Sequence, residues 1–121
     1  MPAIRWTLVG VIATASLLLG STAFAHAHLV KSAPAANAHV ATPRTITLTF
    51  NEELAPAFSK LQIAMADGMK LNIGYSLSDD KLSLIATPSA ALGPGGYTVT
   101  WQAASTADGH MMEGRFSFTV M

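Results

Sequence analysis

From residue 26 onward, apolar and polar residues alternate along the chain. This period of two predicts half-buried β-strands, because successive side chains of a strand point to opposite faces. The alternation is clearest in residues 45–50, where Ile46, Leu48 and Phe50 share one face. It recurs in four later segments, whose apolar faces are Leu61, Ile63 and Met65; Leu82, Leu84 and Ala86; Tyr97, Val99 and Trp101; and Phe116, Phe118 and Val120. Residues 28–32 are also expected to form a strand.

Turn-forming residues separate these segments. They are Ser32-Ala33-Pro34, Asp67-Gly68, Ser78-Asp79-Asp80, Gly93-Pro94-Gly95-Gly96 and Asp108-Gly109. Residues 52–59 can form a helical turn, which Pro56 keeps short. About seven short antiparallel strands with frequent turns predict an all-β fold: a Greek-key β-sandwich or barrel of immunoglobulin-like or cupredoxin-like architecture. Trp101 is expected in its core.

The first 25 residues have the features of a cleaved secretory signal. Arg5 supplies a positive charge, residues 6–19 are apolar, and Ala23-Phe24-Ala25 is an A-x-A cleavage site. We therefore expect a signal peptide over 1–25 and one exported domain over 26–121.

Charge and cysteine content exclude some classes of binding partner and of metal ligand. Seven Lys and Arg balance seven Asp and Glu, and the formal net charge is zero. Such a chain has no basic footprint for nucleic acid or an anionic membrane. With no cysteine, the domain depends on packing for stability and offers no thiolate to a metal, which leaves imidazole, amine, carboxylate and thioether as ligands.

Cleavage after Ala25 would make His26 the first residue of the mature protein. A terminal histidine carries two nitrogen donors, its free amine and its imidazole, which together can chelate a metal ion. Imidazole suits copper, nickel and zinc. Some residue must follow every cleavage site, however. A metal site at His26 is therefore supported only if other possible ligands lie elsewhere in the chain.

Asp108-Gly109-His110 supplies such partners. In extended backbone, positions i and i+2 point to the same side, so a carboxylate and an imidazole are offered together near a strand end. Gly109 permits a sharp turn or a close approach to an ion. An Asp-Gly pair is commonly only a turn, but together with His26 it indicates a copper site.

These features together resemble the CopC/PcoC family of periplasmic copper-binding proteins from bacterial copper resistance. The resemblance covers the whole mature domain, and the order and spacing of its motifs carry it. The motifs are His26, Leu29-Val30, Ser32-Ala33-Pro34-Ala35, Phe50-Asn51-Glu52 (similar to the family's F-S-E), Phe58-Ser59, Gly96-Tyr97-Thr98-Val99-Thr100-Trp101, Asp108-Gly109-His110, Gly114 and Phe116-Ser117-Phe118-Thr119-Val120.

The resemblance implies a Cu(II) site made by the terminal amine and imidazole of His26, the imidazole of His110 and the carboxylate of Asp108. Glu52 matches a glutamate near some family sites; its other interpretation is an exposed, solvated carboxylate. Such a protein would sequester or carry Cu(II) in the periplasm and would not be an enzyme. The resemblance implies a CopD-like inner-membrane transporter or a multicopper oxidase as partner.

His28 has two interpretations. A free amine, two backbone amides and a third-position histidine can form a square-planar chelate for Cu(II) or Ni(II). Strand alternation instead places His28 on the same side as His26, in a supporting role beside the family-type site. We favour the supporting role.

Two features depart from the family pattern. The segment from Trp101 to Asp108 is one residue longer, which either a longer loop or a bulge that re-aims Asp108 would absorb. The methionines are also few for a separate Cu(I) site. Met65 is expected to pack in the core, Met69 is ambiguous, and Met111 and Met112 either pack at an edge or give the site tolerance for Cu(I).

Two other functional classes remain open at this point. One is a copper oxidase with a histidine brace, which would need an aromatic substrate platform and an open coordination position. The other is a metal-free immunoglobulin-like interaction module. His39 has no evident partner and is expected at the surface.

Overall fold

The computed structural model describes residues 26–121, so the expected signal peptide lies outside the described residues. The described chain is built from strands and one short 3₁₀ helix. These are β1 (Leu29–Ala33), β2 (His39–Val40), β3 (Ile46–Phe50), η3 (Pro56–Phe58), β4 (Lys60–Met65), β5 (Ile73–Leu77), β6 (Ser83–Pro88), β7 (Gly95–Ala104) and β8 (Met111–Val120). The helical turn expected within residues 52–59 is confirmed as η3.

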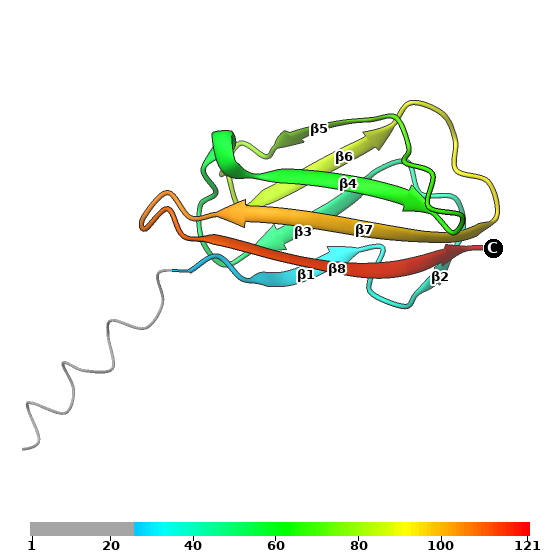
Figure 1. The fold of residues 1–121 in the computed structure, drawn as a ribbon, viewed down its shortest axis with the longest axis horizontal. Helices are drawn as coiled ribbons and strands as arrows, with labels where there is room; N and C mark the ends of the chain where they lie inside the picture. The colour runs from blue at the N-terminus through cyan, green and yellow to red at the C-terminus, as the bar shows by residue number, and fades with distance from the viewer. Residues whose placement is uncertain (1–25) are drawn as a thin grey trace, which may run out of the picture.

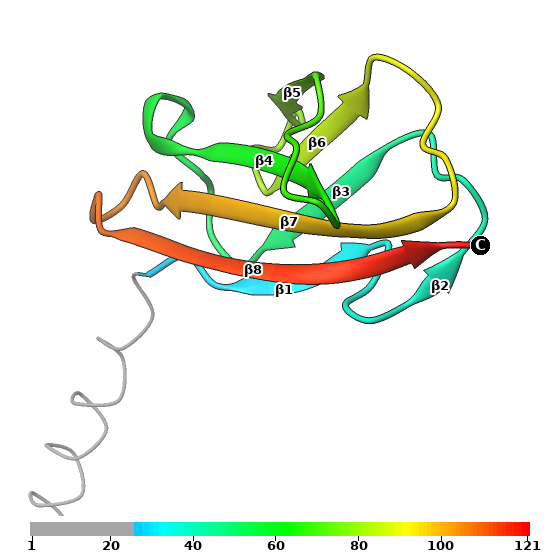
Figure 2. The same ribbon diagram turned by 45° about the vertical axis from the view of Figure 1, so that its right-hand side comes forward.

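The strands form two four-stranded sheets packed face to face, which confirms the predicted β-sandwich (Figure 1). One sheet has the order β1-β3-β6-β5 and the other the order β2-β8-β7-β4. Figure 2 shows the two layers from a second direction, with β7 and β8 running side by side along the length of the molecule. Residues 26–121 thus form eight strands where about seven were expected.

Two details of the strand prediction were wrong. All pairing was expected to be antiparallel, but β2 pairs with β8 in parallel, His39 opposite Thr119. The strands were expected to be short, whereas β7 and β8 have ten residues each. The pairing of β7 with β8 continues without a register shift from Gly95 opposite Val120 to Ala104 opposite Met111. This long hairpin carries its loop to one end of the sandwich.

The inward faces of the strands meet in one core, as their alternation predicted. Ile46 and Leu48 are completely buried. Trp101 is 8% exposed, which confirms its place in the core, and its ring meets that of Phe50 edge to face at 5.1 Å between centroids. Gly114 lies opposite Trp101, where a Cβ atom would come within 2.8 Å of the indole. The core therefore requires glycine beside this tryptophan.

Met65 does not pack in the core, contrary to expectation, and is 38% exposed. It is the last residue of the edge strand β4, and the chain turns directly after it through hydrogen bonds from Met65 N to Met69 O and from Gly68 N to Met65 O. Alternation predicts the face of the strand on which a side chain lies. At the end of an edge strand, few neighbouring residues remain to bury that face.

Three segments meet at one end of the sandwich. They are the start of β1, the loop between β7 and β8, and the connection from β3 to η3 (Figure 1). The C-terminal residue Met121 lies at the opposite end, where its N–H donates to Val40 O at 2.9 Å. The fold thus brings the first described residue and the β7–β8 loop together.

Candidate metal centre

His26, Asp108 and His110 converge at this end of the sandwich. One possible ligand atom from each lies within 4.8 Å of the others. Nδ1 of His26 is 2.8 Å from Oδ2 of Asp108. The rings of His26 and His110 are 4.7 Å apart between centroids and nearly perpendicular, at 81°. The structure therefore brings together the three residues that the sequence singled out.

The β7–β8 loop fixes the position of Asp108. The N–H of His110 donates to Asp108 Oδ1 at 3.0 Å, which leaves Oδ2 directed at His26. Gly109 allows this turn because its φ is +68°, in the left-handed region, and its N–H donates to Ser105 O. The hydrogen bond from His110 N–H, helped by the two imidazoles nearby, lowers the pKa of the Asp108 carboxyl, which favours the ionised form that a metal needs.

The Nδ1 atom of His26 is shielded from solvent and makes no hydrogen bond of good geometry with residues 26–121, although Asp108 Oδ2 is 2.8 Å away. Buried polar atoms normally have partners, because leaving one unpaired costs free energy. A metal ion bound by Nδ1 and the carboxylate would satisfy both groups. Nδ1 is also the ring nitrogen that forms a six-membered chelate with the amine of a terminal histidine, so the donor set fits copper.

The strands on either side of the loop that carries Asp108 contain no bulge. The β7–β8 ladder is regular up to the pair Ala104 and Met111, so the strands contain no bulge, and residues 105–110 make the connection. Ser105 Oγ accepts a hydrogen bond from Ala107 N–H, which closes the first turn of the loop. The loop places Asp108 beside His26.

Residues 51–55 form a strap between the two halves of the site. On one side, His28 N–H donates to Asn51 Oδ1 at 2.6 Å and Asn51 N–H donates to His28 O at 3.1 Å. On the other side, Thr106 N–H donates to Glu53 O at 3.0 Å and Ala55 N–H donates to Ala104 O at 2.8 Å. The strap therefore ties both the chain start and the β7–β8 loop to one segment.

Glu52 lies within this strap and is half-buried. It does not belong to the group of three donors that converge. Asn51 was missed by sequence reasoning. Its one signal was its position directly after a strand, where asparagine often hydrogen-bonds to backbone.

His28 lies beside the three donors but outside their group, with its ring 6.5 Å from that of His26. Its side chain is exposed. Its backbone N–H is taken up by Asn51, so the amide that a square-planar chelate would have to deprotonate is already engaged.

The methionines do not gather at the site. Met69 is 65% exposed and joins Met65 in the turn after β4, which lies at the opposite end of the sandwich (Figure 1). Met111 follows His110 and is 43% exposed, whereas Met112 packs partly against the core. His39 is exposed on β2, as expected.

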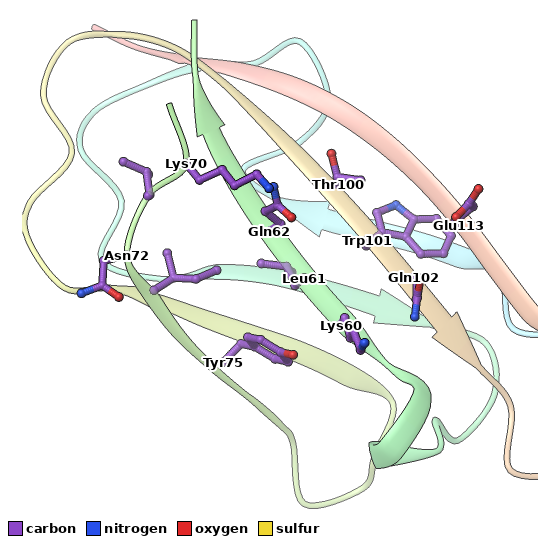
Figure 3. Close-up of a pocket in the computed structure, with 12 residues that line it drawn as sticks. Lys60, Leu61, Gln62, Lys70, Asn72, Tyr75, Thr100, Trp101, Gln102 and Glu113 are labelled. Carbon is purple, nitrogen blue, oxygen red and sulfur yellow. The ribbon is translucent and has the colours of Figure 1, made fainter. Parts of the chain in front are cut away.

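A hollow of about 440 Å³ lies along β4 and the connection to β5. Figure 3 shows Lys60, Lys70, Gln62, Asn72 and Tyr75 around it. Its charged groups are these two lysines and Glu113. This lining has no imidazole and a single carboxylate, so the hollow does not offer the donors of a copper site.

Within residues 26–121, no helix is long and apolar enough to span a membrane. The CopC domain family model matches residues 29–121. Copper resistance protein C of Xanthomonas campestris pv. juglandis is 37% identical over 127 residues, which cover 99% of each chain. Protein YobA of Escherichia coli K12 is 39% identical over 112 residues, which cover 90% of this chain and 89% of the relative.

Solved structures agree with these matches. The crystal structure of PcoC, a methionine-rich copper resistance protein from Escherichia coli, superposes with a TM-score of 0.75 at 33% identity and covers 80% of this chain and 100% of PcoC. CopC from Methylosinus trichosporium OB3b gives a TM-score of 0.72 at 34% identity, covering 78% of this chain and 93% of that one. The fold is therefore the cupredoxin-like β-sandwich of PcoC, and the chain belongs to the CopC family.

Proposed function

We propose that His26, His110 and Asp108 bind one Cu(II) ion at the end of the sandwich. The observation that carries this proposal is the convergence of their three donor atoms within 4.8 Å, with Nδ1 of His26 shielded from solvent and 2.8 Å from Asp108 Oδ2. Membership of a family of copper resistance proteins makes copper the expected metal. The protein is a copper-binding protein that sequesters or carries its ion.

The donor set favours Cu(II). Imidazole and amine nitrogens with a carboxylate oxygen suit Cu(II), whereas Cu(I) prefers the sulfur of thiolate and thioether. In this proposal His26 contributes its amine and Nδ1, His110 its imidazole, and Asp108 its ionised carboxylate. Glu52 is adjacent in the strap and could add an oxygen. The exposed Met65 and Met69 lie at the other end and take no part.

A copper transporter is the partner with the most support. The copper transport protein CutJ of Bacillus subtilis is 26% identical to this chain over 119 residues, which cover 96% of this chain but 21% of CutJ. In that relative a domain similar to this one is part of a larger transport protein. This supports delivery of copper to a CopD-like membrane transporter over delivery to a multicopper oxidase. The signal-like segment 1–25 supports a periplasmic location.

The two alternative functions have less support. The relatives are copper resistance and transport proteins, which does not favour a histidine-brace oxidase. Trp101 is in the core, and the exposed aromatic residues Phe58 and Tyr75 lie in separate elements, η3 and β5. Two exposed aromatic side chains among residues 26–121 are few for a polysaccharide-binding platform. Three converging metal donors also disfavour a metal-free interaction module.

Electron paramagnetic resonance of bound Cu(II) tests the site directly, because nitrogen ligands split the signal. The test compares protein that begins at His26 with protein carrying one extra alanine before it. The extension converts the terminal amine into an amide, so we expect loss of one nitrogen signal and much weaker binding. Equal affinity and identical spectra for the two forms would contradict the terminal chelate.

A further inference from the structure

The start of the mature chain contains donors for two copper chelates that exclude one another. The first uses the terminal amine and His26 with Asp108 and His110, as proposed above. The second uses the same amine, the backbone nitrogens of Ala27 and His28, and the imidazole of His28. This second chelate releases two amide protons to solvent and surrounds Cu(II) with four nitrogens in a plane. Because both chelates need the same amine, only one can form at a time, and the surrounding structure determines which one forms.

The structure blocks the second chelate at the His28 nitrogen. Its N–H donates to Asn51 Oδ1 at 2.6 Å, and Asn51 N–H donates back to His28 O at 3.1 Å. A nitrogen that binds copper must first lose this proton and its hydrogen bond. The side chain of Ala27 is completely buried in the core, and Leu29 is paired with Phe50. Residues 26–28 would have to leave these contacts in order to wrap around an ion.

The same segment holds the competing donors in place. Glu53 O and Ala104 O take part in the hydrogen bonds that join the strap to the β7–β8 loop. Asn51 is thus two residues from Glu53, whose carbonyl accepts from Thr106 in the loop that presents Asp108 and His110. Removing the Asn51 side chain would free the His28 amide while it leaves the strap backbone in place.

We propose that Asn51 is a positioning residue that selects which copper chelate the chain start forms. Its side chain holds the His28 N–H in a hydrogen bond and so keeps residues 26–28 where His26 faces Asp108 and His110. This inference rests on the copper site proposed above. It assigns a selective role to a residue that does not itself touch the metal.

The test follows the Cu(II) paramagnetic resonance and visible spectra of Asn51→Ala, with the chain beginning at His26. We expect the signal to shift to that of a four-nitrogen planar chelate, with visible absorption at shorter wavelength because four nitrogens give a stronger ligand field. In the wild type, binding should depend on His110 and not on His28. In Asn51→Ala it should depend on His28 and lose its dependence on His110, and residual binding at the original site should be about tenfold or more weaker.

Three further proteins complete the design. Asn51→Asp keeps an oxygen acceptor for His28 N–H and should retain the wild-type spectrum. Asn51→Gln moves the acceptor by one carbon, should shift the spectrum, and serves as the test variant if Asn51→Ala does not fold. Asn72→Ala removes an exposed asparagine from the β4–β5 connection and should change nothing.

The outcomes separate this proposal from the site itself. A wild-type spectrum in Asn51→Ala and Asn51→Gln, still dependent on His110, would overturn the role of Asn51 and leave the copper site intact. If replacing His26 or His110 in the otherwise wild-type protein leaves copper binding unchanged, the proposed site itself is overturned. Urea unfolding of the metal-free variants checks that any shift is not a loss of fold.

Discussion

At the scale of single residues, the three proposed copper donors differ in how they are held. Asp108 is fixed by the N–H of His110, which occupies one carboxylate oxygen and leaves the other for the metal. The His26 ring has its Nδ1 2.8 Å from Asp108 Oδ2 and its centroid 4.7 Å from that of the His110 ring. The donors also differ in strength, because imidazole is a better copper ligand than a single carboxylate oxygen.

His110→Ala should therefore lower Cu(II) affinity more than Asp108→Ala. The first removes a nitrogen donor, while the second removes one oxygen whose place water can take. Competition titration against a chelator of known affinity measures both. Asp67→Ala, which removes an exposed carboxylate in the turn after β4, is the control and should bind as the wild type does. Unchanged affinity in His110→Ala would contradict the proposed ligand set.

The individual donors could be predicted, but their neighbours could not. His26 follows from the cleavage site, and Asp108 and His110 follow from their i and i+2 spacing. The role of Asn51 depends on a hydrogen bond to a residue 23 positions earlier, which no local pattern reveals. The failure at Met65 has the same origin. Alternation predicts the face on which its side chain lies, but the burial of that side chain depends on where the edge strand ends.

At the scale of strands and turns, the pair Trp101 and Gly114 controls the β7–β8 hairpin that carries the site. A Cβ at position 114 would lie 2.8 Å from the indole. Gly114→Ala should therefore destabilise the protein by about 1–3 kcal/mol, the usual range for overpacking a core. Urea unfolding of the metal-free protein measures this.

Gly74→Ala is the matched control for that change. Position 74 is in β5, and a Cβ there would meet nothing within 4 Å. The same substitution should be neutral or stabilise by up to about 1 kcal/mol, because alanine restricts the unfolded chain. Equal losses at the two positions would mean that glycine itself, and not the contact with Trp101, is what matters.

The turn between β5 and β6 should make stability depend on acid. Hydrogen bonds from the Ser78 hydroxyl and the Leu82 N–H to Asp80 lower the pKa of its carboxyl. A lowered folded-state pKa means that the ionised carboxyl stabilises the fold above its unfolded pKa, about 3.9. That stabilisation is lost as the pH falls through the folded-state pKa.

Asp80→Asn should therefore be less stable than the wild type at pH 7, and the difference should shrink as the pH falls below about 4. Urea unfolding at several pH values measures this. Asp79→Asn makes the same charge change at a neighbouring exposed carboxyl that accepts no side-chain hydrogen bond within residues 26–121. A pH dependence that is the same in both variants would show that net charge, and not the turn, is responsible.

Most strands could be predicted because their inward faces are apolar at every second position. β5 was not predicted, although Ile73, Tyr75 and Leu77 also recur at every second position. It is an edge strand that buries little of this face, and Tyr75 is 44% exposed. β2 has two residues, and its parallel pairing with β8 is set by how the chain crosses the sandwich. Sheet order and edges of this kind arise from contacts between distant segments, which a local period does not encode.

At the scale of the whole molecule, the proposed copper ion would join two parts of a fold that is already complete without it. The core strands bury their own apolar faces without a metal, so the metal-free protein should unfold cooperatively. Copper should then add stability by mass action, about 2.7 kcal/mol when free copper is a hundred times the dissociation constant.

Hydrogen exchange with and without Cu(II) should locate that gain. Added protection is expected in residues 26–28, in the strap 51–55 and in the loop 105–110, because the metal pins a chain start and a loop that otherwise open locally. His110→Ala with copper is the control and should lack this pattern. Protection spread evenly over all strands would mean that the metal builds the fold.

The proposed copper site and Met121 lie at opposite ends of the sandwich, so a fixed distance separates them. β8 begins directly after His110 and ends directly before Met121, so at about 3.3 Å per residue its ten residues set a spacing of about 30 Å. Because the chain has no cysteine, one cysteine introduced at position 121 would carry a nitroxide label at a unique place. Dipolar coupling between that label and bound Cu(II) falls within the range of pulsed measurements. The same molecule would therefore report whether the proposed copper site is occupied and when the ion leaves it, with the label held about 30 Å from that site.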